Sequence, residues 1–273
     1  MRHRALLATA VLVAVATAAP LPAAAAPPGL ANPAHNAPPM SMAVCFQGGR
    51  PVVGYSSPAC ARSQLSAIDK ARAGEGLGPM VLPGWYSKLT VPEQLLVVTD
   101  LEREARGLPI FVGLSASLDA MARKGALAGV DPVGPALGAW GSNWAGGYPT
   151  ALAADFGWMY DDGPGSYNLD CTRANMSGCW GHRDNILGNY GPHPFMGAAS
   201  VPYDGTTTSM TELFATWAPG PLVWRLPGRI GASSGGFSAP AATTTTTPMP
   251  LPAGTPSPPH HPAPAVTGSA DAG

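Results

Sequence analysis

Two pieces of sequence decide the fold we expect: Trp158-Met159-Tyr160 and, after a short insertion, Cys179-Trp180-Gly181-His182-Arg183-Asp184-Asn185-Ile186-Leu187. His182 is one of few histidines in the body of the chain and precedes a short apolar run that ends at Gly188. A pair of cysteines, three aromatic residues and an acidic loop surround it in the sequence. His182 is therefore the first candidate for a functional residue.

Both ends of the chain differ in composition from its middle. Residues 1–25 have Arg2 and Arg4, then an apolar run, then small residues, which is the pattern of a signal peptide cut after Ala25. The apolar run is short for a transmembrane anchor. We expect a secreted or cell-envelope-associated protein, with residues 26–41 as a flexible lead-in. Residues 226–273 are rich in Pro, Thr and Ala and predict a disordered tail, either a stalk or a tolerated low-complexity end.

The chain has four cysteines, an even number that fits disulfides in an oxidising compartment. Three pairings are formally possible. The local one, Cys45–Cys60 with Cys171–Cys179, is favoured because each pair brackets a stretch rich in turn-forming residues. A zinc site is the alternative, but the sequence has no C-x-x-C pair.

The composition excludes some partners. The formal net charge is −1 and only 11% of residues are charged, so no basic face is expected to neutralise phosphates of nucleic acid. No second apolar stretch of about 20 residues follows the signal peptide, so we expect no membrane span after processing.

Local patterns place the elements. Residues 42–88 predict a disulfide-stapled extension, with a hairpin around Gly48-Gly49 and a helix over 61–73. In the main domain, residues 89–225, Thr90 and Glu93 form a capping box, and Gly107 ends the helix that follows. Further helices are expected from Ser117 and over 150–162, a loop over 131–149, and strands over 195–201 and 209–217 joined by a turn at Asp204-Gly205.

Glu212 is the second candidate for chemistry. It interrupts a strand that is apolar on both faces, which predicts a central strand covered on both sides. A carboxylate there is paired, hydrogen-bonded or neutral. One interpretation is a catalytic pair of His182 and Glu212 that moves a proton. The other is structural: Glu212 ties the strand to a loop, and His182 packs beside Trp180.

Other motifs are weaker. Gly113-Leu114-Ser115-Ala116-Ser117 misses the last residue of a nucleophile elbow. An acidic run has calcium-ligand residue types without the alternating spacing, which favours a solvated loop (Asp161, Asp162, Asn168, Asp170). Tryptophans could line a glycan platform or a lipid groove, although core packing explains most of them (Trp140, Trp144, Trp158, Trp180).

From about Thr90 to Trp217 the chain resembles the CAP superfamily of cysteine-rich secretory, antigen 5 and pathogenesis-related proteins, in its bacterial secreted branch. Three segments carry the resemblance: Leu101 to Pro109, Trp158-Met159 with Gly181 to Leu187, and Met196-Gly197-Ala198 with Thr211 to Ala215. It implies a three-layer α-β-α sandwich with a cleft that in many relatives holds two histidines and two acidic residues. Here Ser142 stands in place of the glutamate of a G-E-N motif, and no histidine lies between Gly107 and His182. We therefore expect no metal and no cofactor.

The expected function is binding of an apolar or cell-envelope ligand in a cleft near His182 and Glu212, with Ser142, Trp144, Trp158 and Trp180 as ligand-binding residues. This interpretation favours a binding protein over an enzyme. One alternative is a hydrolase acting on protein or peptidoglycan, with His182 as general base. Another is a surface adhesin displayed on the Pro/Thr-rich tail.

Overall fold

The structure is a computed structural model that describes residues 28–47, 50–51, 57–173, 177–203 and 207–227. The expected signal peptide, the turn at Asp204-Gly205 and nearly all of the tail lie outside the described residues. The helices are α1 (Pro58–Gly74), α2 (Val91–Ala105), α3 (Ala116–Ala128), α4 (Ala151–Tyr160) and α5 (Gly181–Ile186), with short 3-10 helices at Ala43–Cys45 and Tyr86–Lys88. The strands are β1 (Phe46–Gln47), β2 (Arg50–Pro51), β3 (Leu114–Ser115), β4 (Trp140–Tyr148), β5 (Ser177–Trp180), β6 (Phe195–Pro202), β7 (Thr208–Ala215) and β8 (Leu222–Trp224).

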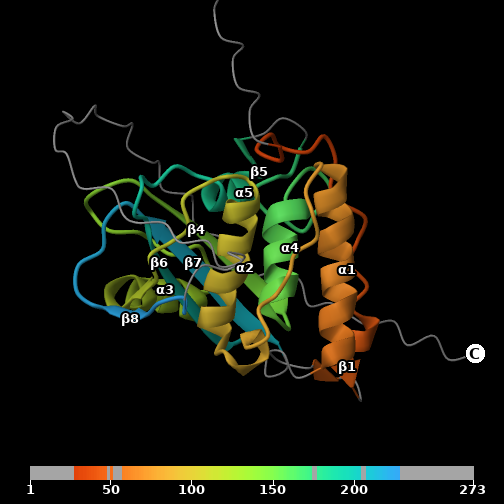
Figure 1. The fold of residues 1–273 in the computed structure, drawn as a ribbon, viewed down its shortest axis with the longest axis horizontal. Helices are drawn as coiled ribbons and strands as arrows, with labels where there is room; N and C mark the ends of the chain where they lie inside the picture. Colours follow the sequence, from red (N-terminus) through yellow and green to blue (C-terminus); the bar gives the residue numbers. More distant parts are fainter. Residues whose placement is uncertain (1–27, 48–49, 52–56, 174–176, 204–206, 228–273) are drawn as a thin grey trace, which may run out of the picture.

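A mixed sheet lies at the centre of the fold (Figure 1). It has five strands in the order β4-β7-β6-β3-β8. β7 pairs antiparallel with β4 and with β6, β3 runs parallel to β6, and β8 closes the far edge antiparallel to β3. Every residue of β7 is buried. The expected central, doubly covered strand at Glu212 is therefore confirmed.

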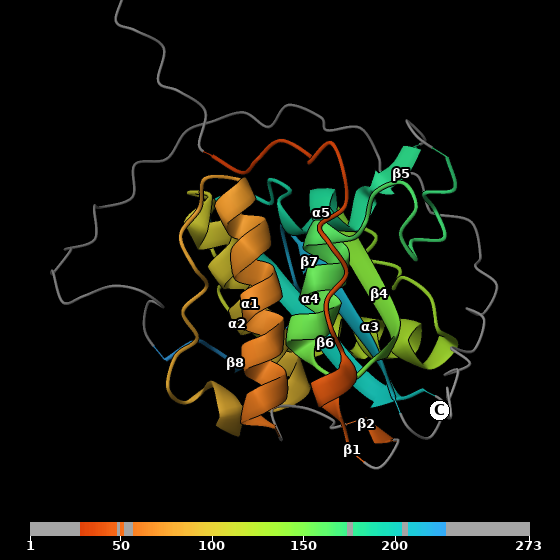
Figure 2. The ribbon, with the colours of Figure 1, turned by 90° about the vertical axis from the view of Figure 1, so that its right-hand side faces the viewer.

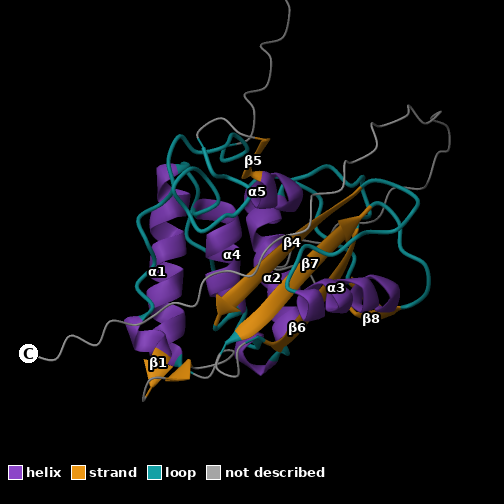
Figure 3. Cartoon of the chain, turned by 180° about the vertical axis from the view of Figure 1, so that it is seen from behind, coloured by secondary structure: helices purple, strands orange, loops and turns teal. Residues whose placement is uncertain are grey.

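Helices cover both faces of the sheet (Figure 3). The side-chain alternation along β7 shows this directly, because successive residues of a strand point to opposite faces. The Thr211 hydroxyl donates to the Ala122 carbonyl of α3, while the next residue, Glu212, accepts from Thr99 of α2. The hydrophobic core divides in the same way: Leu213 belongs to the cluster under α3, and Phe214 to the larger cluster under α2 and α4. The chain is thus a mixed α/β fold.

The capping box expected at the start of α2 is present. The backbone N–H of Thr90 donates to the Glu93 carboxylate at 2.7 Å, and α2 ends before Gly107, whose φ is 71°. The hairpin of β1 and β2 and the helices α1, α3 and α4 also lie where the sequence places them. Both local disulfides form, Cys45–Cys60 and Cys171–Cys179.

The expected loop over 131–149 is wrong in its second half, which forms strand β4. Its glycines indicate a loop in sequence, but in the fold they allow close packing. A Cβ on Gly141 would lie 2.3 Å from the Tyr190 hydroxyl and 2.7 Å from the side-chain oxygen of Asn185. Glycine is needed here so that α5 and the segment after it can approach the edge strand.

The N-terminal segment, residues 28–41, is held on the body of the protein, where an unstructured lead-in was expected. Figure 2 shows it running beside α1 and α4. The Ala37 N–H donates to the Tyr160 carbonyl, and the Asn36 side chain accepts from the Gly163 N–H. The carbonyl oxygen of Gly29 accepts from two buried arginines, Arg106 at 2.7 Å and Arg183 at 2.8 Å.

Those arginines belong to a buried ionic cluster that joins α1, α2, α4 and α5. Glu102 accepts from Arg72, Arg106 and the Tyr160 hydroxyl, and Glu75 pairs with both Arg106 and Arg183. Each charge has an opposite partner, as burial requires. Among the described residues, no helix is long and apolar enough to cross a membrane.

Candidate functional site

His182 lies in the first turn of α5, just beyond the edge strand β4. The residue before the helix, Trp180, has a φ of 64°, which is unusual for a non-glycine residue and puts the chain into α5 at a sharp angle. Trp180 is buried against Gly163, where an added Cβ would lie 2.5 Å from the indole ring. This contact fixes the turn that presents His182.

Two aspartates flank the imidazole. Its Nδ1 lies 2.6 Å from Asp162 Oδ1, and the backbone N–H of His182 donates to the other oxygen of the same carboxylate at 2.9 Å. On the opposite side of the ring, Nε2 lies 3.6 Å from Asp131 Oδ1, an ion-pair distance. Asp162 follows α4 and Asp131 follows α3, so three helices contribute to this arrangement.

The two carboxylates decide the charge of the ring. Burial alone would lower the pKa of His182, but the charges of Asp162 and Asp131 and the hydrogen bond to Asp162 outweigh it and raise the pKa well above its ordinary value. Burial raises the pKa of Asp162, and the neighbouring imidazolium opposes that rise. The two carboxylates therefore favour the protonated imidazolium, in which neither ring nitrogen has a free lone pair to act as a base.

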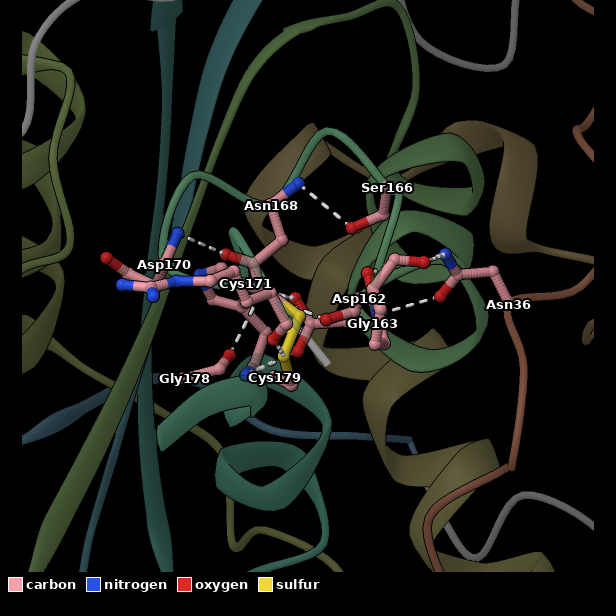
Figure 4. The surroundings of a disulfide bond; sticks show 12 residues. Asn36, Asp162, Gly163, Ser166, Asn168, Asp170, Cys171, Gly178 and Cys179 are labelled. Carbon is pink, nitrogen blue, oxygen red and sulfur yellow. Dashed lines mark hydrogen bonds and ion pairs between the residues drawn. A yellow bond between two sulfur atoms is a disulfide. The ribbon is translucent and has the colours of Figure 1, made fainter. Parts of the chain in front are cut away.

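Within the acidic run after α4, Asp162 has a definite structural role. Asp162 is buried, and its carboxylate is held by Asn168 as well as by His182. Figure 4 shows Asp162 and Asn168 near the Cys171–Cys179 disulfide. The Asn168 side-chain amide donates to Asp162 Oδ1 at 2.6 Å, to the Asp162 carbonyl at 3.0 Å and to the Gly178 carbonyl at 3.0 Å. The loop next to the Cys171–Cys179 disulfide therefore supplies Asn168, the residue that holds Asp162 in contact with His182.

Glu212 is fully buried on β7. The Thr99 hydroxyl donates to its Oε1 at 2.6 Å. Burial raises the pKa of Glu212 to about 8, against the lowering effect of hydrogen bonds from Thr99 and Asn143 and of the charge on His182. At neutral pH this carboxyl is therefore mostly protonated.

The structure separates His182 from Glu212, which sequence reasoning had interpreted as a possible pair. Asn143 on β4 stands between them: it is the register partner of Glu212, and its amide donates to the His182 carbonyl at 3.2 Å. The carboxylates in contact with the imidazole are Asp131 and Asp162. Sequence spacing gives no signal for them, because each follows the C-terminus of a different helix.

The tryptophans are largely structural. Trp158 is buried and donates its indole N–H to the Trp144 carbonyl, and Trp180 fills the turn described above. Trp144 is partly exposed, donates to Ser209 and packs against Tyr203. Ser142 is buried and accepts from the Asn185 amide through its carbonyl oxygen. Of these four, only Trp144 offers a partly exposed ring to a ligand.

A groove of about 730 Å³, whose lining does not include His182, lies between the N-terminal segment and α1. Small and apolar residues of 31–39 and of α1 provide most of its lining, and it extends to Glu75 and Tyr160. This size is typical of small-molecule sites. Sequence reasoning missed this groove, because it treated residues 26–41 as unstructured.

Within the described parts of the chain, no group of three or more His, Cys, Asp or Glu side chains is placed to hold a metal ion. Comparison of the chain with protein-family models, with curated proteins and with solved structures gives no match.

Proposed function

We propose that this chain is an exported protein of the CAP type that binds a cell-envelope ligand without cleaving it. The signal-peptide pattern and the two disulfides support an oxidising, extracytoplasmic location. The motif residues Gly181 to Leu187 form α5 at the edge of a sheet with helices on both faces, which agrees with the expected α-β-α arrangement.

The observation that carries the proposal is the imidazole of His182 between Asp131 and Asp162. A general base needs an unprotonated nitrogen facing the substrate. Here both ring nitrogens face carboxylates, which raise the pKa of the ring and favour its cationic form. The site is therefore suited to recognition of a ligand rather than to proton abstraction.

A specific feature keeps hydrolysis as the second candidate. The contact of Asp162 with Nδ1 is the geometry by which a carboxylate orients a catalytic histidine. If a substrate displaced the longer contact from Asp131, Nε2 would face it. A hydrolase of this kind predicts activity that rises with pH as the imidazolium loses its proton.

The test incubates the mature protein with cell-envelope extract, followed by mass spectrometry for bound lipid and for new cleavage products. His182→Ala is the site variant, and His193→Ala, an exposed histidine on a loop, is the matched control. Bound ligand without products, weakened only by His182→Ala, supports the proposal. Products that disappear in His182→Ala establish the hydrolase, and the absence of both ligand and products contradicts both functions.

A further inference from the structure

Asp162 accepts hydrogen bonds from Trp180 and Asn168 in addition to those from His182. Its carbonyl oxygen accepts from the Trp180 N–H at 3.0 Å and from Asn168, and its Oδ1 accepts from both Asn168 and His182. Asn168 is thus the one side chain that contacts both the carboxylate and the backbone of Asp162 among the described hydrogen bonds.

Asn168 is itself fixed by its own loop. Its N–H donates to the Ser166 hydroxyl at 3.0 Å, its side-chain oxygen accepts from the Asp170 N–H at 2.9 Å, and its carbonyl accepts from the Cys171 N–H at 3.2 Å. Figure 4 shows this side chain within the loop, next to the disulfide.

The disulfide joins the two ends of this arrangement. Cys171 follows Asn168 closely in sequence, and Cys179 directly follows Gly178, whose carbonyl accepts from Asn168. Cys179 is also two residues before Gly181 at the start of α5. The covalent bond therefore keeps the donor Asn168 and the segment leading to His182 together. Cys171 is buried and Cys179 is partly exposed, so a thiolate can reach one sulfur of the bond.

We propose that Asn168, held by the Cys171–Cys179 disulfide, is a positioning residue for the Asp162–His182 contact, and that reduction of this disulfide by a dithiol releases the contact. The dithiol attacks Cys179, the S–S bond breaks, and two electrons and two protons pass to the protein, leaving two thiols and an oxidised, disulfide-bonded reductant. The inference concerns the charge of His182 and stands whether or not the cleft binds a ligand.

The charged and titratable groups that act on His182 come from three elements besides its own. They are Asp162 after α4, Asp131 after α3 and Glu212 on β7. Burial and the charge of the neighbouring Asp162 raise the pKa of Asp161 to about 6. Of these, Asp162 makes the hydrogen bond to the ring, so its displacement removes the strongest support for the imidazolium.

The test is an NMR pH titration of the His182 ring in the mature full chain. Asn168→Ala and the double variant Cys171→Ser/Cys179→Ser are compared with Cys45→Ser/Cys60→Ser, which removes the disulfide at the far end of α1. We expect the His182 midpoint to fall by roughly one pH unit or more in the first two and to stay unchanged in the control. Circular dichroism verifies that each variant is folded.

A second measurement avoids dependence on the folding of the serine variants. In the Cys45→Ser/Cys60→Ser background, the remaining disulfide is reduced with dithiothreitol and His182 is titrated before and after. A midpoint that falls on reduction and recovers on reoxidation supports the inference. A midpoint that is unchanged or rises, in folded Asn168→Ala or after reduction, overturns it.

Discussion

At the scale of the residue, burial sets the protonation state of Glu212. It is enclosed on a central strand with Thr99 and Asn143 as partners, and its pKa of about 8 makes it a neutral acid near pH 7. A protonated carboxyl combines a hydrogen-bond donor with an acceptor, as a side-chain amide also does. The residue therefore acts in the fold much as glutamine would.

Replacing Glu212 with Gln should remove a pH dependence of stability. The folded pKa lies above the unfolded value near 4.5, so the wild-type protein loses stability as the pH rises between the two values, by roughly 1.4 kcal/mol for each pH unit in that interval. Melting temperatures at pH 5, 7 and 9 should show a gain for the variant that grows with pH. Glu104→Gln, on the exposed side of α2, is the control. A gain that is equal at all three pH values contradicts the assignment.

The sequence predicts these two residues because each is conspicuous: His182 by the scarcity of histidine, and Glu212 by a carboxyl within an apolar strand. Asp131 carries no such signal, and Asp162 stands out only as a member of an acidic run. Each looks like an ordinary aspartate in a Gly/Pro-rich connection, and only the docking of α3 and α4 on opposite faces of the sheet brings both to one imidazole.

At the scale of the element, the N-terminal segment is anchored through one glycine. Gly29 has a φ of 75°, and an added Cβ would meet Glu75, Leu77 and Arg106 at 2.9 to 3.0 Å. Gly76 has the same φ with nothing near its Cβ position, and so it is a matched control for backbone strain.

Gly29→Ala should therefore destabilise the protein more than Gly76→Ala does. In both variants, an alanine in the left-handed backbone region costs about 1 kcal/mol of stability. Gly29→Ala also displaces the N-terminal segment from the two buried guanidinium groups of Arg106 and Arg183. Hydrogen exchange of the Ala37 amide, which donates to the Tyr160 carbonyl, reports that displacement. Equal exchange rates in the two variants count against the anchor.

Element prediction succeeded where local chemistry dominates, as at Thr90 and Glu93, and failed where tertiary contacts reverse a local signal. β4 is the main failure. Gly141 and Gly146 indicate a turn in sequence, but in the fold their missing side chains make room for Tyr190 and for the Trp144 ring. The short strands β3 and β8 are too brief to leave a pattern.

At the scale of the whole molecule, the buried ionic cluster connects the N-terminal extension to the main domain. The i, i+4 spacing of Glu102 and Arg106 is the favourable order for an ion pair along a helix, but the sequence does not show that the pair is buried. In the structure both are fully buried, because α1 and the N-terminal segment cover that side of α2.

Arg106→Met should cost about 3 to 5 kcal/mol, since it leaves buried carboxylates without their partner. The exposed Arg123→Met on α3 should change stability by less than about 0.5 kcal/mol. Urea unfolding midpoints measure both. A loss for Arg106→Met no larger than that of the control would show that the extension is not bound through this cluster.

We expect His182 to be a cation held between Asp131 and Asp162. NMR titration of its ring nitrogens in the mature protein tests it, with Asp162→Asn and Asp131→Asn as variants. We predict a wild-type midpoint above the ordinary value near 6.5, a larger fall for Asp162→Asn than for Asp131→Asn, and a ring protonated on both nitrogens at pH 7. A wild-type midpoint at or below 6.5 would contradict this protonated state and show that His182 is available as a base.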